Sequence, residues 1–248
     1  MKILVCLGHV PDTTTKVKFL DSKAFDKTGV QWIINPWDEF ALTRALELKE
    51  DAGNQVSSVT VITVGGKEAE PTMRKALAIG ADDGIRIDAE PLDAWFVAAQ
   101  IAEAVKDKGF DIILAGTDSS DYNGSVTGGM LAEFLNINSV SSVSELMING
   151  NEIELIRDID GGKEKVNIAC PFVAVVHKGI SKEVRIAAMR GIMMARKKVL
   201  NVVAPVSAEP LTEYESFELP EPKPPCRMVN ADNVEELVNL LHNEAKVL

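Results

Sequence analysis

Short apolar runs alternate with amphipathic stretches along the first 135 residues of the chain. Each run has the length of a buried strand, and the stretches between runs repeat their apolar side chains at helical spacing. This alternation predicts an α/β fold, in which a parallel sheet is flanked by helices and joined by right-handed crossovers. The predicted strands are residues 2–7, 59–64, 84–87 and 112–115, and the predicted helices are 35–48, 71–79, 92–108 and 130–135.

Local signals support these helix boundaries. Asn35 is predicted to be an N-cap, with Pro36 at the first helical position and Asp38 in the first turn. Gly80 and Gly109 follow the next two helices, where glycine commonly ends a helix. The boundaries therefore agree with the periodicity.

Two parts of the chain are expected to be antiparallel. Residues 17–19 and 30–34 flank a turn-rich segment and predict a small hairpin. After residue 136, alternating strands surround the turn signal Asn149-Gly150-Asn151 and predict an antiparallel extension of the sheet. The strands expected there are residues 141–148, 152–157, 163–169 and 171–176.

The C-terminal part reads as an arm followed by a helix. Six prolines between residues 205 and 225 exclude helix and central strand, so 206–228 is predicted to be extended. Residues 231–247 predict an amphipathic helix. We therefore expect a nucleotide-binding domain over 1–200 and, over 201–248, an arm and helix that dock on a partner subunit or pack on their own domain.

One loop is unusual in composition. Residues 116–129 follow the fourth predicted strand and are rich in Gly, Ser, Thr, Asp and Asn, and no Lys or Arg occurs between Gly116 and Phe134. In a parallel sheet, ligands bind at the carboxyl ends of the strands, so this loop, with residues 6–10 and 64–67, is a candidate anion site. Backbone N–H groups, hydroxyls and a helix N-terminus would hold the anion. The loop matches neither common phosphate motif, and an ordinary strand–helix connection is the alternative.

Composition narrows the class of partner. A net charge of −11 argues against nucleic acid, and three widely spaced cysteines suit a reducing compartment. No apolar run approaches the roughly 20 residues that span a bilayer, and the apolar N-terminus is expected to be the first strand rather than a signal peptide.

Catalytic patterns are not evident. His9, His177 and His242 are far apart and lie in no metal-ligand motif, and no G-x-S-x-G occurs. Asp118 and Asp121 could bind a divalent ion, but in such a loop they are more often turn residues. The sequence therefore favours a protein that holds a ligand without catalytic residues of its own.

Residues 178–199 invert the charge of the chain locally. They contain seven Lys or Arg residues and one acid, Glu183, together with Met189, Met193 and Met194. Methionines with basic flanks are typical of an adaptable interaction surface. An amphipathic helix with its methionines in the core is the alternative, and the pattern leaves both open.

Five stretches together resemble the β subunit of electron transfer flavoprotein. The most specific are NPWDEFALTRALELKE, TMRKALAIGADD and RIAAMRGIMMARKK, and the hairpin IRDIDGG is also similar. The resemblance follows the chain in order over about residues 1 to 200. The matching stretches are residues 5–12, 35–50, 72–83, 116–135 and 185–198.

The resemblance implies a heterodimeric electron carrier. In this family FAD is held mainly by the α subunit, and the β subunit binds AMP with a structural role, or a second FAD in electron-bifurcating members. Electrons would come from dehydrogenases, such as acyl-CoA dehydrogenases, and pass to a quinone reductase. The implied location is the bacterial cytoplasm, or the mitochondrial matrix in a eukaryote.

Site residues follow from the matching motifs. Asn35 and Pro36 would lie near the adenine, and a Cβ at Gly128 would block the approach of the phosphate. The residues expected around the phosphate are Asn123, Gly124, Ser125, Thr127 and Gly128. The complete predicted set is Cys6, Asn35, Pro36, Trp37, Asp38, Val64, Asp121, Tyr122, Asn123, Gly124, Ser125, Val126, Thr127, Gly128, Gly129, Met130, Leu131 and Ala132.

Residues 178–199 correspond to the recognition loop of the family, which anchors the partner dehydrogenase. Met189 stands at the anchoring position, an apolar hot spot ringed by charge. The predicted docking residues are Met189, Arg185, Arg190 and Ile192.

The loop SSDYNGSVTGGM departs from the usual pattern of the AMP-binding members, which carry acids and asparagine before T-G-Q-M. AMP remains favoured, with a second FAD as the alternative. Two rivals come from other classes: an adenine-nucleotide hydrolase and a nucleotide-sensing module.

Overall fold

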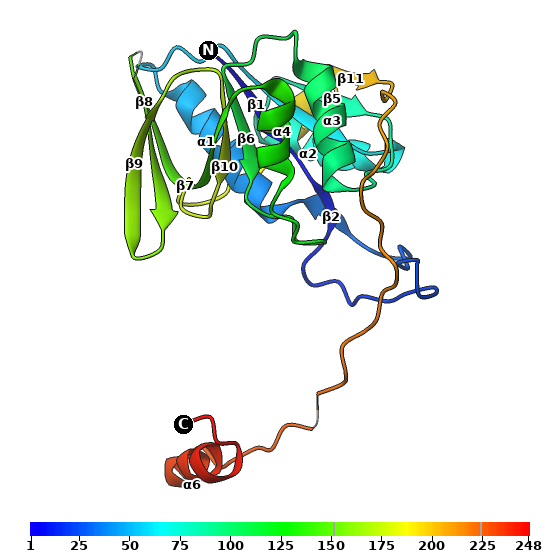
Figure 1. The fold of residues 1–248 in the computed structure, drawn as a ribbon, viewed down its shortest axis with the longest axis vertical. Helices are drawn as coiled ribbons and strands as arrows, with labels where there is room; N and C mark the ends of the chain where they lie inside the picture. Colours follow the sequence, from blue (N-terminus) through cyan, green and yellow to red (C-terminus); the bar gives the residue numbers. More distant parts are fainter. Residues whose placement is uncertain (151, 224) are drawn as a thin grey trace. The chain divides into compact units, whose positions relative to one another are not determined.

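The structure is a computed structural model that describes residues 1–150, 152–223 and 225–248. The chain divides into two compact units. The first contains the α/β domain, coloured from blue to orange in Figure 1. The first unit comprises Met1–Lys16 and Asp26–Glu215, and the second comprises Val17–Phe25 and Ser216–Leu248.

A nine-stranded sheet runs through the first unit in the order β11-β5-β4-β1-β6-β10-β7-β8-β9 (Figure 1). All neighbours from β11 to β7 are parallel, and β8 and β9 are antiparallel, so the predicted α/β class is confirmed. The strands are β1 (Lys2–Cys6), β4 (Ser58–Val64), β5 (Asp83–Ile87), β6 (Ile112–Gly116), β7 (Asn138–Asn149), β8 (Glu152–Ile159), β9 (Gly162–Ile168), β10 (Phe172–Val176) and β11 (Leu200–Val203).

Helices cover both faces of this sheet. Because side chains alternate along a strand, Ile3 and Val5 of β1 join one core cluster, whereas Leu4 and Cys6 join the other. The first cluster includes side chains of α1 (Pro36–Glu50), α2 (Glu70–Ile79) and α5 (Met189–Ala195). The second includes side chains of α3 (Ala94–Val105) and α4 (Thr127–Leu135). A short 3-10 turn, η1 (Lys67–Ala69), precedes α2.

The helix ends follow the local sequence signals. Asn35 occupies the N-cap position of α1 and Gly80 ends α2, as predicted, although the Asn35 side chain bonds elsewhere. Asp93 caps α3 by accepting the N–H of Phe96 at 2.7 Å. Helix α4 begins at Thr127, three residues before the predicted start.

The structure corrects two predicted pairings. Strand β10 does not belong to the antiparallel extension, because it lies between β6 and β7 and is parallel to both. The small hairpin pairs β3 (Trp32–Ile34) with β2 (His9–Pro11) instead of residues 17–19. The physical reason is burial: Val10 faces Ile33 in the ladder and is 1% exposed, whereas Val17 is 49% exposed.

The second unit contains the end of the chain. The described residues of 206–228, of which 206–215 still belong to the first unit, form no helix or strand, as expected from their prolines. Helix α6 (Val234–Asn239) continues into a π-helical turn, η2 (Leu240–Glu244), and is shorter than the predicted 231–247. The turn residue Asn151 lies outside the described residues.

Candidate functional site

The candidate site lies where the strand order of the sheet reverses. From β1 the chain passes to β4 and β5 on one side and then returns to β6 on the other side of β1. The carboxyl ends of β1 and β6 therefore flank a topological switch point, which is where ligands bind in open α/β sheets. Cys6, Val64 and Gly116 end β1, β4 and β6, so the structure brings together the three loops that the sequence singled out.

Asp38, in the first turn of α1, clamps the ends of β1 and β6. Its Oδ2 accepts the N–H of Gly8 at 2.7 Å, and its Oδ1 accepts the N–H of Gly116 at 2.8 Å. A Cβ at Gly116 would collide with this carboxylate. Asp38 is 6% exposed, so it shapes the site from within.

Asn35 links the same clamp to the loop after β6. Its Nδ2 donates to Oδ2 of Asp38 at 3.1 Å and to the carbonyl of Asp118 at 2.7 Å. Its Oδ1 accepts the N–H of Ser120 at 3.2 Å. The Asn35 side chain therefore positions the loop rather than capping its own helix.

Burial controls the ionisation of the groups at this point. Burial raises the pKa of Asp38 to about 7, although the N–H groups of Gly8, Asn35 and Gly116 oppose that rise, and the negative charge of Asp121 adds to it. Burial also raises the pKa of the Cys6 thiol, and the nearby charge of Asp38 adds to the effect. Cys6 therefore stays a protonated, unreactive thiol, in agreement with a structural role.

The last part of the loop from β6 to α4 is an exposed turn in which two residues have positive φ. Asn123 and Ser125 have φ of 50° and 54°, in the left-handed region that residues other than glycine rarely adopt. Within the loop, Oδ1 of Asp121 accepts the N–H of Tyr122 at 2.8 Å. Asp121 is thereby engaged in the turn itself, as Asx residues commonly are.

The N-terminus of α4 lacks a side-chain cap. Val126 occupies the N-cap position and cannot accept a bond from the first turn. Gly124 and Gly129 are open, because a Cβ on either would meet nothing within 4 Å. A helix N-terminus with free N–H groups and small neighbours is suited to bind an anion.

Gly128 serves the packing of α4 rather than the approach of a phosphate. A Cβ there would lie 2.6 Å from Cγ2 of Val175 on β10 and 3.4 Å from Cβ of Ala115 on β6. The expectation that this Cβ would fill the phosphate's approach is therefore wrong, because the position faces the sheet. Leu131 and Ala132 also face the core, at 0% and 2% exposure, so only their backbone could reach a ligand.

We expect Gly128→Ala to destabilise the protein by about 1 to 3 kcal/mol, as overpacked sites do. Gly129→Ala is the matched control, because its Cβ meets nothing within 4 Å and alanine favours helix by about 1 kcal/mol. Urea unfolding of both variants measures the difference. Equal stability of the two proteins would contradict the packing role of Gly128.

Most side chains of the segment 178–199 are exposed, and the segment is only partly helical. Residues 178–188 contain no helix or strand, and α5 follows with Met189 at 75% and Met193 at 67% exposure. Ile186 before the helix is 91% exposed. These values exclude the alternative in which the methionines form part of the core.

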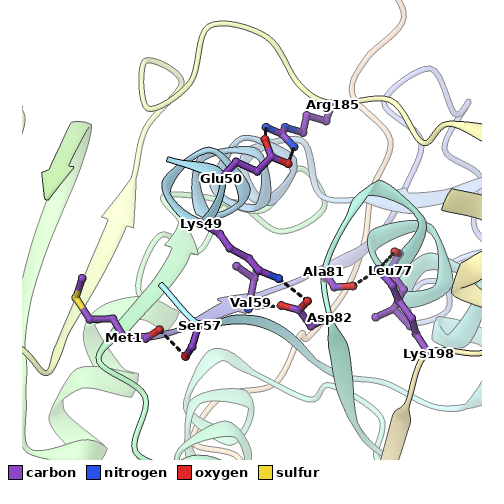
Figure 2. Close-up of polar contacts among 10 residues, drawn as sticks. All are labelled: Met1, Lys49, Glu50, Ser57, Val59, Leu77, Ala81, Asp82, Arg185 and Lys198. Atoms are coloured by element: carbon purple, nitrogen blue, oxygen red, sulfur yellow. Dashed lines mark hydrogen bonds and ion pairs between the residues drawn. The ribbon is translucent and has the colours of Figure 1, made fainter. Parts of the chain in front are cut away.

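Two of the predicted docking residues differ in their surroundings. Ile192 is 45% exposed on α5. The guanidinium of Arg185 instead donates to both carboxylate oxygens of Glu50, at 2.6 Å each (Figure 2). The hydrogen bonds from Arg185 lower the pKa of Glu50. Arg185 is thus bound to its own domain, a pairing that the sequence analysis missed because the two residues are far apart in the chain.

Among the described residues, no three His, Cys, Asp or Glu side chains are grouped so that they could hold a metal ion. Within the same residues, no helix has the length and apolar character needed to cross a membrane.

The sequence is similar to those of known proteins over most of its length. The family model described as "Electron transfer flavoprotein domain" matches residues 23–208. The chain is 35% identical, over the full length of both proteins, to the electron transfer flavoprotein subunit beta of Bacillus subtilis. It is 34% identical to the protein of the same name in Syntrophomonas wolfei, over 90% of this chain and 87% of that protein. The human protein of that name is 28% identical over 100% of this chain and 99% of its own.

Proposed function

We propose, because the chain belongs to the β-subunit family of the electron transfer flavoproteins, that it binds an adenine nucleotide and forms one half of a heterodimeric electron carrier. The observation that carries the proposal is the loop from β6 to α4, which has neither Lys nor Arg and leads into an uncapped helix N-terminus. That loop is tied to the switch point by Asn35 and Asp38. The α subunit is the other half and holds most of the FAD, which supplies reversible electron transfer when bound.

The nucleotide in this chain is AMP, and its role is structural. The backbone N–H groups of residues 124–129 would hold its phosphate, supported by the helix dipole of α4. Asn35 and Pro36 would lie beside the adenine, and Cys6 and Val64 would form the apolar floor at the strand ends. The remaining residues of the site are Trp37, Asp38, Asp121, Tyr122, Asn123, Met130, Leu131 and Ala132.

We expect mass spectrometry of the ligand released from the denatured heterodimer to detect AMP in an amount equal to the protein. FAD at two equivalents per heterodimer would instead indicate the electron-bifurcating type, with the second FAD in this chain. An empty nucleotide site in carefully purified heterodimer would contradict the proposal. ATP turnover by this chain would favour a hydrolase, and failure of any flavoprotein subunit to co-purify would favour a sensor.

Residues 178–199 would bind the electron donor. The exposed Met189 and Ile192 offer an apolar anchor, and Arg190 beside them offers charge for an acidic rim on the partner. The donor would be a dehydrogenase, such as an acyl-CoA dehydrogenase, and the acceptor a quinone reductase. The protein would act in a bacterial cytoplasm or a mitochondrial matrix.

The arm and α6 would dock on the α subunit. Val234, Leu237 and Val238 on α6 are 63%, 44% and 50% exposed, so the helix presents apolar side chains that a partner could cover. Asn233 stabilises the start of α6 by accepting the N–H of Glu236 at 3.2 Å. This proposal predicts that the terminal helix binds the other subunit rather than the nucleotide site.

A further inference from the structure

Helix α5 is too short to be stable by itself. It has seven residues, Met189–Ala195, whereas isolated helices below about 12 to 15 residues are marginal in water. Gly191 in its middle weakens it by about 1 kcal/mol more. Its exposed methionines add little burial, so its order must come from contacts with the rest of the domain.

The contact that α5 makes is with α2. A Cβ at Gly191 would collide with the carbonyl oxygen of Ala78, in the last turn of α2, so glycine is needed where the two backbones approach. Ala195, at the end of α5, is 3% exposed. The helix is thus seated by its two smallest residues, and its large side chains remain outside.

Two basic side chains cap the two helices reciprocally. Nη1 of Arg74, on α2, donates to the carbonyls of Ala195 and Lys198 at 2.9 Å each, at the end of α5. Nζ of Lys198 donates to the carbonyls of Leu77 and Ala81, at 2.9 and 2.5 Å, at the end of α2 (Figure 2). Each helix therefore receives cationic donors at its C-terminus, where carbonyls are unpaired and the dipole is negative.

The loop that receives Lys198 is itself fixed. Asp82, next to Ala81, accepts Nζ of Lys49 at 2.5 Å and the N–H of Val59 at 2.7 Å (Figure 2). Lys198 therefore binds a loop that is itself held by the end of α1 and the start of β4.

The other end of the segment is also attached. The N–H of Arg185 donates to Oγ1 of Thr43 on α1 at 3.1 Å, and its guanidinium binds Glu50 at the end of α1. Residues 186–194 are thereby attached to α1 at one end and to α2 at the other. This arrangement limits the conformations that the exposed side chains can adopt.

We propose that Arg74 and Lys198 are positioning residues for docking, which hold α5 so that Met189 faces an apolar, acid-rimmed site on the electron-donating partner. The inference rests on the proposed docking role of residues 178–199. A surface that is already ordered loses less conformational entropy on binding, so the two caps raise affinity without touching the partner.

The test compares Lys198→Met and Arg74→Met with Lys197→Met in the purified heterodimer. Lys197 is the matched control for hydrogen exchange alone, because it is the exposed neighbour with the same charge but belongs to the proposed docking segment. We expect hydrogen exchange of the amides in 189–196 to accelerate about tenfold in the first two variants, from the loss of charge-assisted hydrogen bonds, and to stay unchanged in the control. With an acyl-CoA dehydrogenase as the probe, KM for the flavoprotein should rise about tenfold in Lys198→Met and Arg74→Met, with kcat and AMP content unchanged.

Two further variants strengthen the test. Lys198→Arg keeps a cationic donor and should restore slow exchange, and Gly191→Ala should loosen α5 without removing a charge. Unchanged exchange in both Lys198→Met and Arg74→Met would overturn the inference, and so would faster exchange with an unchanged KM. A failure of docking itself is distinguished by Met189→Ala: KM unchanged in that variant would refute the docking role, whatever the exchange rates are.

Discussion

Asp38→Asn is expected to destabilise the protein by about 1 to 3 kcal/mol at pH 4, because one carboxyl oxygen is replaced by an amide that faces N–H donors. Asp38 accepts the N–H groups of Gly8 and Gly116 and the side-chain amide of Asn35, and an asparagine retains only one acceptor oxygen. The ends of β1 and β6 would then separate. Urea unfolding measures the loss, and mass spectrometry of the released nucleotide measures whether the site still holds AMP.

The loss should also depend on pH. The pKa of Asp38 is raised in the folded protein from 3.8 to about 7, so between about pH 4 and 7 the folded state binds a proton that the unfolded state has released. The stability that Asp38 contributes is therefore largest at low pH and falls by about 4 kcal/mol as pH rises through that window. The variant lacks this titration, so its disadvantage at pH 4 should disappear or reverse by pH 8.

Asp107→Asn is the control for this experiment, since Asp107 is an exposed acid on the same domain. Its effect should stay within about 0.5 kcal/mol at every pH. A difference between wild type and Asp38→Asn that stays constant from pH 4 to 8 would contradict the raised pKa.

Met189→Ala is expected to raise KM for the electron-donating dehydrogenase about 30-fold, the effect of removing a hot spot of about 2 kcal/mol. Met189 is 75% exposed, so its loss removes little packing within the chain. Folding stability and nucleotide content should be unchanged. Steady-state reduction of the heterodimer by the dehydrogenase gives KM, and thermal unfolding gives stability.

Ile159→Ala is the control, because Ile159 is 45% exposed at the end of β8 and lies outside both residues 178–199 and the arm. It should leave KM unchanged. A parallel loss of stability and activity in Met189→Ala would mean that Met189 supports the fold instead of binding the partner.

The sequence predicted the parallel sheet because its pattern is local. Runs such as 59–64 and 112–115 are mostly apolar because both faces of those strands are buried. The helices between them repeat their apolar residues at helical spacing. Strand β10 was placed wrongly because nothing in a short buried run records which neighbours it will have. Strand β11 was missed since it adds only four residues at the edge of the sheet.

The loops of the candidate site were also predicted from the sequence, but the orientation of its residues was not. Loops at the carboxyl ends of strands must meet, so residues 116–129 could be named without a structure. The orientation of Gly128 could not, because it depends on how α4 rotates over Val175. Likewise, the capping of α2 by Lys198 joins residues more than 100 positions apart, which no local pattern records.

The pairing of Arg185 with Glu50 and the hydrogen bonds from the Lys198 ammonium to two carbonyls affect how the chain meets other proteins. Of the seven cations in residues 178–199, Arg185 is paired with an acid and Lys198 is bound to carbonyls of its own domain, and the other five are exposed. Salt screens both the attraction of this patch and the repulsion from the chain's net charge of −11 beyond about one Debye length, near 8 Å at physiological ionic strength. Within that distance an acidic protein is repelled in most orientations and attracted only over this patch, so charge selects the orientation of approach before any apolar contact forms.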